Sequence, residues 1–195
     1  MSELEVESSY TPDAEALRWV LGPVVIDLPG TLAVVHVPTE GQSVSFRVEL
    51  VENMLRPTAI TVSSLIGEEI TSTDLRAVNV KNLWRSAIVK HLEYHREFFA
   101  SENNDEIHVT VGNSIRLPDE ELENLRLRGP ERATLGYVAD IYSLGRLIGL
   151  APALYVQQIF AGENLDPLPR TTATKWIKKA RDLGMIEGWI YNGND

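Results

Sequence analysis

The sequence "LPRTTATKWIKKARDLGMI", residues 168 to 186, has the pattern of a short amphipathic helix with clear ends. At about 100° per residue, its apolar side chains fall on one face. They are Ala173, Trp176, Ile177, Ala180 and Leu183. Either Thr171 or Thr172 can cap the amino end, and Gly184 can stop the helix. We therefore predict a helix over residues 170–183 with one packed face and one exposed face.

The exposed face of this predicted helix is basic. Five cations and no acid lie between Arg170 and Arg181, although the whole chain has a formal net charge of -10. In a helix-turn-helix module, such a helix reaches base edges while flanking Lys and Arg contact phosphates. The candidate DNA-binding residues are Arg170, Thr171, Thr172, Thr174, Lys175, Lys178, Lys179 and Arg181. Among them Thr171, Thr174, Lys175 and Lys178 would face the bases, and Arg170, Lys179 and Arg181 would position the helix.

Two more helices are predicted before this segment. The first carries an apolar stripe, and the second begins at Pro152, a residue suited to the first turn of a helix. The stripes are Leu135, Val138, Ile141, Tyr142, Gly145 and Ile148, then Ala153, Val156, Ile159 and Phe160. Together the three helices predict an all-α, helix-turn-helix-like domain over residues 131–190. The loop "AGENLDPLP" is longer than the turn of the compact motif, and "MIEGWIY" predicts one short strand after the last helix.

The N-terminal part differs from these helices in composition and in the pattern of its apolar residues. Residues 1–16 are acidic and poor in apolar side chains, which predicts a flexible tail. The β-branched runs "VVIDL", "LAVVHV", "VSFRVELV" and "TAITVSSL" follow, separated by turn signals such as "PG", and predict four antiparallel strands. In "SVSFRVEL" the inward residues would be Val44, Phe46, Val48 and Leu50.

A long helix from about Asn79 to Ala100 is predicted to cover the apolar face of this sheet. Its stripe comprises Val80, Leu83, Trp84, Ala87, Ile88, Leu92 and Phe99. "TSTDLRAV" before it predicts a capped helical turn, "EIHVTV" predicts a fifth strand, and Pro118 marks another helix start. The expected fold is α+β: an N-terminal domain over residues 17–128, joined at Gly129-Pro130 to the C-terminal helices.

The C-terminal run also resembles a group of known proteins. In "YVADIYSLGRLIGLAPALYVQQIF" and "LPRTTATKWIKKARDLGMIEG", the matching residues are Val138, Ala139, Tyr142, Pro152, Arg170, Thr171, Thr172, Trp176, Ile177, Ala180, Arg181 and Gly184. This pattern resembles the helix-turn-helix end of uncharacterised proteins common in actinobacteria and their mobile elements. "EEITSTDLRAVNV" is similar to an element found upstream in such proteins. The resemblance implies DNA binding and transcriptional control.

Composition narrows the remaining classes of function. The chain has no cysteine, which excludes disulfides, thiolate metal sites and cysteine nucleophiles. It has no apolar run of the length that spans a membrane, and the acidic start "MSELEVESSYTPDAE" is unlike a signal peptide. We therefore expect a cytoplasmic protein that does not bind membranes. A sequence pI near 4.9 opposes general attraction to nucleic acid, so any DNA contact must be local.

Catalytic and cofactor motifs are absent from the sequence. There is no nucleophile elbow, phosphate-binding loop or dinucleotide fingerprint, so we expect neither an enzyme nor a cofactor. His91 and His95 lie four residues apart, a spacing that could place two metal ligands on one helix face. "HLEYH" lacks the His-Glu-x-x-His order, however, and we expect packed histidines and no metal.

The sequence thus predicts a sequence-specific reader of double-stranded DNA that regulates transcription. A single module makes few contacts, so useful affinity calls for a homodimer or tandem sites, and the N-terminal domain would dimerise or bind a ligand or protein partner. The alternative is a protein-interaction adaptor that uses the same basic helix on an acidic partner. A metal-dependent enzyme around His91 and His95 is a third hypothesis.

Overall fold

The computed structural model describes residues 7–21, 24–35, 41–99, 106–111, 116–161 and 165–186, with the backbone alone at 21, 93–99 and 106–111. The chain divides into two compact units. Unit 1 comprises residues 1–19 and 25–93, and unit 2 comprises residues 20–24 and 94–195. Among the described residues, no helix has the length and apolar character needed to cross a membrane.

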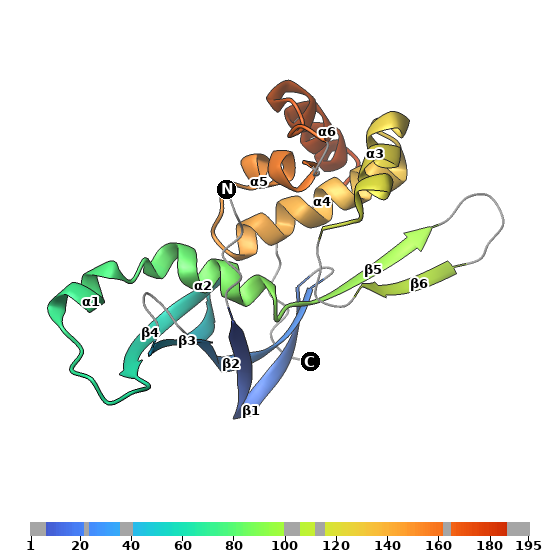
Figure 1. Cartoon of the computed structure of the whole chain (residues 1–195). Helices are drawn as coiled ribbons and strands as arrows, with labels where there is room; N and C mark the ends of the chain where they lie inside the picture. The colour runs from blue at the N-terminus through green and yellow to red at the C-terminus, as the bar shows by residue number, and fades with distance from the viewer. Residues whose placement is uncertain are drawn as a thin grey trace. The chain divides into compact units, whose positions relative to one another are not determined.

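Unit 1 is built on four strands (Figure 1): β1 (Ser8–Leu21), β2 (Val24–Val35), β3 (Gln42–Val51) and β4 (Met54–Ser64). β1 pairs with β2, and the β2–β3 and β3–β4 pairs are antiparallel. The predicted separation at Pro29-Gly30 is wrong, because both residues lie inside β2. Alternate β2 side chains stay buried through this point, so a single strand spans the two predicted ones.

The sheet buries one face, as the alternation in the sequence predicts. Val44, Phe46 and Val48 of β3 are buried, which confirms three of the four inward positions, whereas Leu50 is only half-buried. The buried side chains of β2 and β4 in the same core are Ile26, Leu28, Leu32, Val34 and Leu55. This apolar layer is the main source of stability in unit 1.

The flexible tail predicted over residues 1–16 is contradicted by β1 for residues 8–16, while residues 1–6 lie outside the described part. Most β1 side chains are exposed or half-buried, so hydropathy gave no signal for a strand. Pairing with β2 and polar contacts hold β1 instead. The Tyr10 hydroxyl donates to the Asp27 carbonyl at 2.7 Å, and Arg47 pairs with Asp13 at 2.8 Å.

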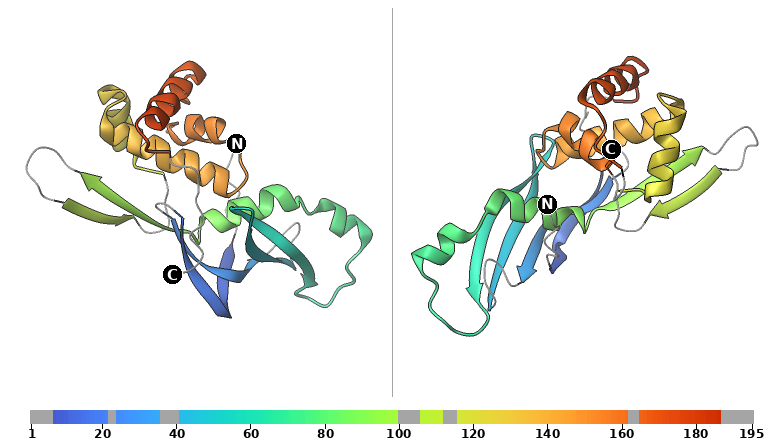
Figure 2. Two further views of the ribbon diagram at one scale, coloured as in Figure 1. Left: turned by 180° about the vertical axis from the view of Figure 1, so that it is seen from behind. Right: turned by 45° about the horizontal axis from the view of Figure 1, so that its top comes forward.

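Two helices follow β4: α1 (Ser72–Ala77) and α2 (Val80–Val89). Thr71 forms a capping box with Asp74, which confirms the predicted capped turn. Both pictures show α2 lying over one face of the sheet (Figures 1 and 2). Its buried residues are Leu83, Trp84, Ala87 and Ile88.

The long covering helix predicted to reach Ala100 is not observed. α2 ends at Val89, and residues from Glu93 onward form strand β5 (Glu93–Phe99), which pairs antiparallel with β6 (Glu106–Val111). The segment "EYHREFF" is rich in aromatic side chains that suit a strand, and pairing with β6 overrides the helical spacing of Leu92 and Phe99. β6 confirms the strand predicted at "EIHVTV".

Unit 2 also contains α3 (Asp119–Arg128), α4 (Arg132–Leu147), α5 (Pro152–Ile159) and α6 (Arg170–Asp182). α4, α5 and α6 pack on one another in pairs, so the predicted three-helix cluster is present. α3, which begins directly after Pro118 as predicted, also packs on α4. The Thr134 hydroxyl donates to the Leu125 carbonyl at 3.2 Å. Gly129-Pro130 lies inside unit 2 and is not a boundary between the two compact units, which lie at residues 19/20, 24/25 and 93/94.

Gly30 tests the packing of β1 on β2. A Cβ atom at Gly30 would meet the Tyr10 hydroxyl and lie 3.0 Å from the Thr11 carbonyl oxygen. We expect Gly30→Ala to lower the free energy of unfolding by about 1–3 kcal/mol, as overpacking does. Urea unfolding followed by circular dichroism measures the change. Gly136→Ala is the control, because a Cβ there meets nothing within 4 Å and Ala favours the helix. Equal stability of Gly30→Ala and wild type would contradict the packing described.

Candidate nucleic-acid interface

A chain of aromatic side chains fixes the orientation of α6. The rings of Phe160 and Trp176 meet edge to face with centroids 5.7 Å apart, and those of Tyr137 and Phe160 do so at 5.4 Å. Tyr137 belongs to α4 and Phe160 caps the carboxyl end of α5, so three helices share one contact. The buried residues of α6 are Ala173, Trp176, Ile177 and Ala180, as predicted.

The ends of α6 differ in part from the prediction. Pro169 occupies the N-cap position without a side-chain cap, so Thr171 and Thr172 lie inside the helix and the predicted threonine cap is wrong. Proline can begin a helix because it needs no hydrogen-bond partner for its nitrogen. Leu183, predicted in the apolar stripe, is 59% exposed. It lies at the C-cap, one residue beyond the last helical turn.

Gly184 ends α6 as predicted. It has a φ of 71°, and its N–H donates to the Arg181 carbonyl at 2.9 Å. The Met185 N–H donates to the Ala180 carbonyl, also at 2.9 Å, which completes a Schellman motif. The positive φ favours glycine, so this residue gives the helix a defined end.

The predicted DNA-binding residues share one surface, which we call the basic face. Seven of the eight are exposed: Arg170, Thr171, Thr174, Lys175, Lys178, Lys179 and Arg181. Thr172 is half-buried and is the least accessible member. The Thr174 hydroxyl donates to the Arg170 carbonyl at 2.8 Å, so its oxygen can still accept a hydrogen bond. Burial of Trp176 and Ala180 thus turns these polar side chains to solvent.

The cations of the basic face fall into two groups. Lys179 Nζ donates to the Pro130 carbonyl at 3.0 Å, and Arg181 donates to the Tyr142 hydroxyl at 3.2 Å while lying 5.8 Å from the centre of its ring. These two residues connect α6 to its own domain. In the described ranges, the side chains of Lys175 and Lys178 make no ion pair or hydrogen bond. Their ammonium groups are therefore available to a ligand.

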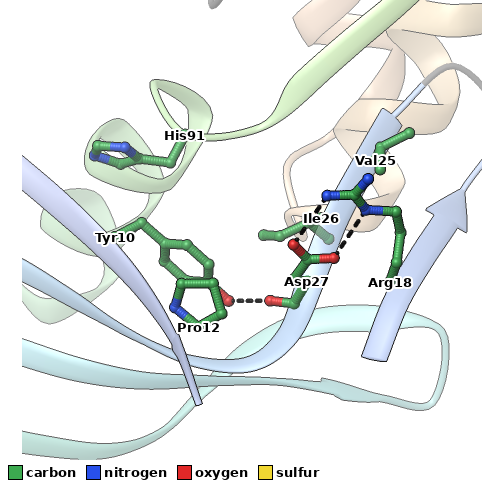
Figure 3. Close-up of a pocket in the computed structure, with 7 residues that line it drawn as sticks. All are labelled: Tyr10, Pro12, Arg18, Val25, Ile26, Asp27 and His91. Atoms are coloured by element: carbon green, nitrogen blue, oxygen red, sulfur yellow. Dashed lines mark hydrogen bonds and ion pairs between the residues drawn. The ribbon is translucent and has the colours of Figure 1, made fainter. Parts of the chain in front are cut away.

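A cavity in unit 1 is a second candidate site, one that the sequence did not indicate (Figure 3). It has a volume of about 210 Å³ and is lined by Tyr10, Pro12, Arg18, Val25, Ile26, Asp27 and His91. Its charged groups already neutralise each other, because Arg18 makes two hydrogen bonds to the Asp27 carboxylate, at 3.0 and 3.2 Å. The cavity thus presents no uncompensated charge of its own to a ligand.

The polar groups around this cavity serve the fold. Burial and the nearby carboxylates of Asp13 and Asp27 raise the pKa of Tyr10 to about 12. His91 stacks on Tyr10 with ring centroids 6.3 Å apart and is hydrogen-bonded to the Ser8 hydroxyl at 2.9 Å. These contacts join the start of β1 to the end of α2.

The structure removes the geometric basis for a metal site at His91 and His95. α2 ends at Val89, so the two histidines do not share a helix, and the His95 side chain lies outside the described residues. Within the described ranges, no group of three or more His, Asp or Glu side chains could hold a metal ion. The predicted packing of His91 is present through Tyr10 and Ser8.

Comparisons with known proteins add no assignment. No protein-family model, curated protein or solved structure matches the chain. The candidate interface therefore depends on its own geometry and chemistry.

His91 gives a prediction about pH. Burial, and next the charge of Lys90, hold the pKa of His91 below its ordinary value of 6.5. Between that lowered pKa and about 6.5, the unfolded chain binds a proton that the folded chain does not. Stability should therefore fall as the pH drops through this window. His91→Gln, which keeps a hydrogen-bonding amide near Ser8, should lose less stability than wild type between about pH 7.5 and pH 5.5 in urea unfolding. The same loss in both proteins would show that His91 does not contribute.

Proposed function

We propose that the protein binds double-stranded DNA through the basic face of α6 and regulates transcription. The observation that carries the proposal is the exposed row of cations on a helix whose opposite face is held by the packed aromatic rings of Tyr137, Phe160 and Trp176. Arg170, Lys175 and Lys178 project from this helix without an acidic residue in its first turn. A rigid helix with outward cations and hydroxyl groups suits the major groove of DNA.

Electrostatics near α6 favour a phosphate partner. The amino end of a helix carries a partial positive charge, and here no side-chain cap occupies it. Arg170 adds a full positive charge at the same end, and Lys175 and Lys178 follow along the exposed face. These groups would neutralise phosphates and release counterions, which supplies affinity without reading sequence.

Specificity would come from the polar side chains nearest the bases. Thr171 and Thr174 offer hydroxyl groups, and lysines such as Lys175 and Lys178 donate to guanine acceptors, contacts worth roughly 1–3 kcal/mol each for a good pair. Lys179 and Arg181 already bind their own domain, so their role would be to hold α6 in place while contacting the DNA backbone. Thr172 would support the helix from its half-buried position.

A regulator built on this single helix needs a second point of attachment. One module makes few base contacts, so a homodimer or tandem sites would supply useful affinity. Unit 1 would provide the dimer contact or bind a ligand or protein that controls the DNA-binding unit. The acidic remainder of the chain would suppress loose binding to arbitrary DNA.

Selection from a random duplex library at near-physiological salt tests this function. We expect a motif to be enriched, and Lys175→Ala/Lys178→Ala to bind the enriched site at least about tenfold more weakly. The slope of log affinity against log salt should fall by roughly 0.9 for each phosphate that the variant no longer neutralises. Arg76→Ala/Lys81→Ala is a matched control, because it also removes two exposed cations, from unit 1.

The two double variants distinguish the possible outcomes. If both weaken DNA binding equally, only net charge matters, and the proposal that α6 reads the DNA sequence is wrong. If no motif is enriched, the regulator proposal fails for this protein. Capture of an acidic protein partner that depends on Lys175 and Lys178 would then favour an adaptor that uses the same face.

A further inference from the structure

The connection between α5 and α6 poses a mechanical problem for a DNA-reading helix. Nine residues separate Phe160 from Arg170, and a long loop leaves the following helix free to shift unless it is tied down. A displacement of about 1 Å can misplace contacting groups at a binding site. The proposed function therefore requires something that fixes the start of α6.

Arg126 of α3 supplies such a tie. Its Nη1 atom donates to the Phe160 carbonyl at 3.3 Å and to the Asp166 carbonyl at 2.6 Å. One guanidinium group thus holds the carboxyl end of α5 and a point four residues before Arg170. Phe160 occupies the C-cap of α5, where a cation is also favoured by the helix dipole. Hydrogen bonds from a charged donor are stronger than neutral ones.

A second hydrogen bond carries the constraint to α6. The Leu168 N–H donates to the Gln157 carbonyl of α5 at 3.1 Å, and the Leu168 side chain is only 4% exposed. Pro169 follows as the N-cap, and its fixed φ restricts the last backbone step before the helix. The position of Asp166 therefore largely determines that of Arg170.

Arg126 is itself firmly anchored. Leu122 and Leu125 of α3 are buried, and the Leu125 carbonyl accepts the Thr134 hydroxyl of α4 at 3.2 Å. We propose that Arg126 is a positioning residue that sets the first turn of α6 for DNA by bridging Phe160 and Asp166. This inference rests on the proposed function, and it makes α3 a working part of the DNA-binding unit.

Arg126→Ala tests the bridge, with Arg128→Ala as the matched control. Arg128 lies on the same helix and is exposed, so its loss removes the same charge without removing the bridge. Hydrogen exchange of the amides of Leu165, Asp166 and Leu168 is the direct readout, because Pro167 and Pro169 have no N–H. We expect faster exchange at Leu168 in Arg126→Ala only, with helical circular dichroism unchanged in both variants.

DNA binding to the selected site is the second readout. Arg126→Ala should weaken binding about tenfold, a loss expected for charge-assisted hydrogen bonds, while the salt slope stays at the wild-type value. If Arg126 contacted a phosphate directly, its removal would instead reduce the magnitude of that slope. Unchanged exchange at 165–169, a lowered slope, or equal losses in both variants would overturn the inference.

The two readouts also separate this inference from the proposed function. If wild type binds no DNA while Arg126→Ala loosens residues 165–169, the proposed function fails and only the bridge remains. If wild type binds DNA and exchange is unchanged, the bridge fails and the DNA-binding function remains. Should Arg126→Ala lose its helical signal, Arg126→Lys, which keeps the charge and the aliphatic stem, is compared with Arg128→Ala on the same two readouts.

Discussion

The packing of Trp176 against Phe160 is the interaction on which the candidate interface depends. An amphipathic helix can rotate about its axis unless a large side chain fixes one face, and Trp176 fixes that face by meeting Phe160, which in turn meets Tyr137. Once these aromatic rings are packed, the helical spacing of α6 turns the side chains of Lys175 and Lys178 toward solvent. The basic face is therefore a consequence of core packing, and a change in the core would move the surface chemistry.

The two units reach stability in different ways. In unit 1, a sheet with one buried face carries the core, and β1 is added by strand pairing and polar contacts, since most of its side chains remain exposed or half-buried. In unit 2, apolar helix faces supply most of the stability, and single polar contacts such as Arg126 to Asp166 fix the connections. Packing between helix faces fixes the direction of a helix well, but it constrains loops poorly. The long connection before α6 therefore needs a tie of its own.

This difference explains what the sequence could predict. The helices of unit 2 and the inward side of β3 followed from periodicity, because burial alone decides which residues face the core. Periodicity did not predict β1, because this strand is held by pairing with the backbone of β2, and hydropathy does not indicate backbone pairing. The same holds for residues 93–99, where helical spacing continues but β6 provides a strand partner. For the candidate interface, the exposed residues were found from spacing, whereas the Arg126 bridge joins positions forty residues apart and left no local signal.

The charge distribution has a consequence for how α6 would meet DNA. Five of the eighteen Lys and Arg residues lie from Arg170 to Arg181. The remaining thirteen are outnumbered by the twenty-eight Asp and Glu residues of the chain. At a separation of several Debye lengths, about 10 Å each at 0.1 M salt, the whole chain and DNA interact little, and closer in the acidic surface repels phosphates. Attraction begins only when the basic face itself comes within contact range. Encounters in any other orientation would not lead to a complex, so the acidity of the chain and the basicity of one helix would together make the proposed DNA binding depend on orientation.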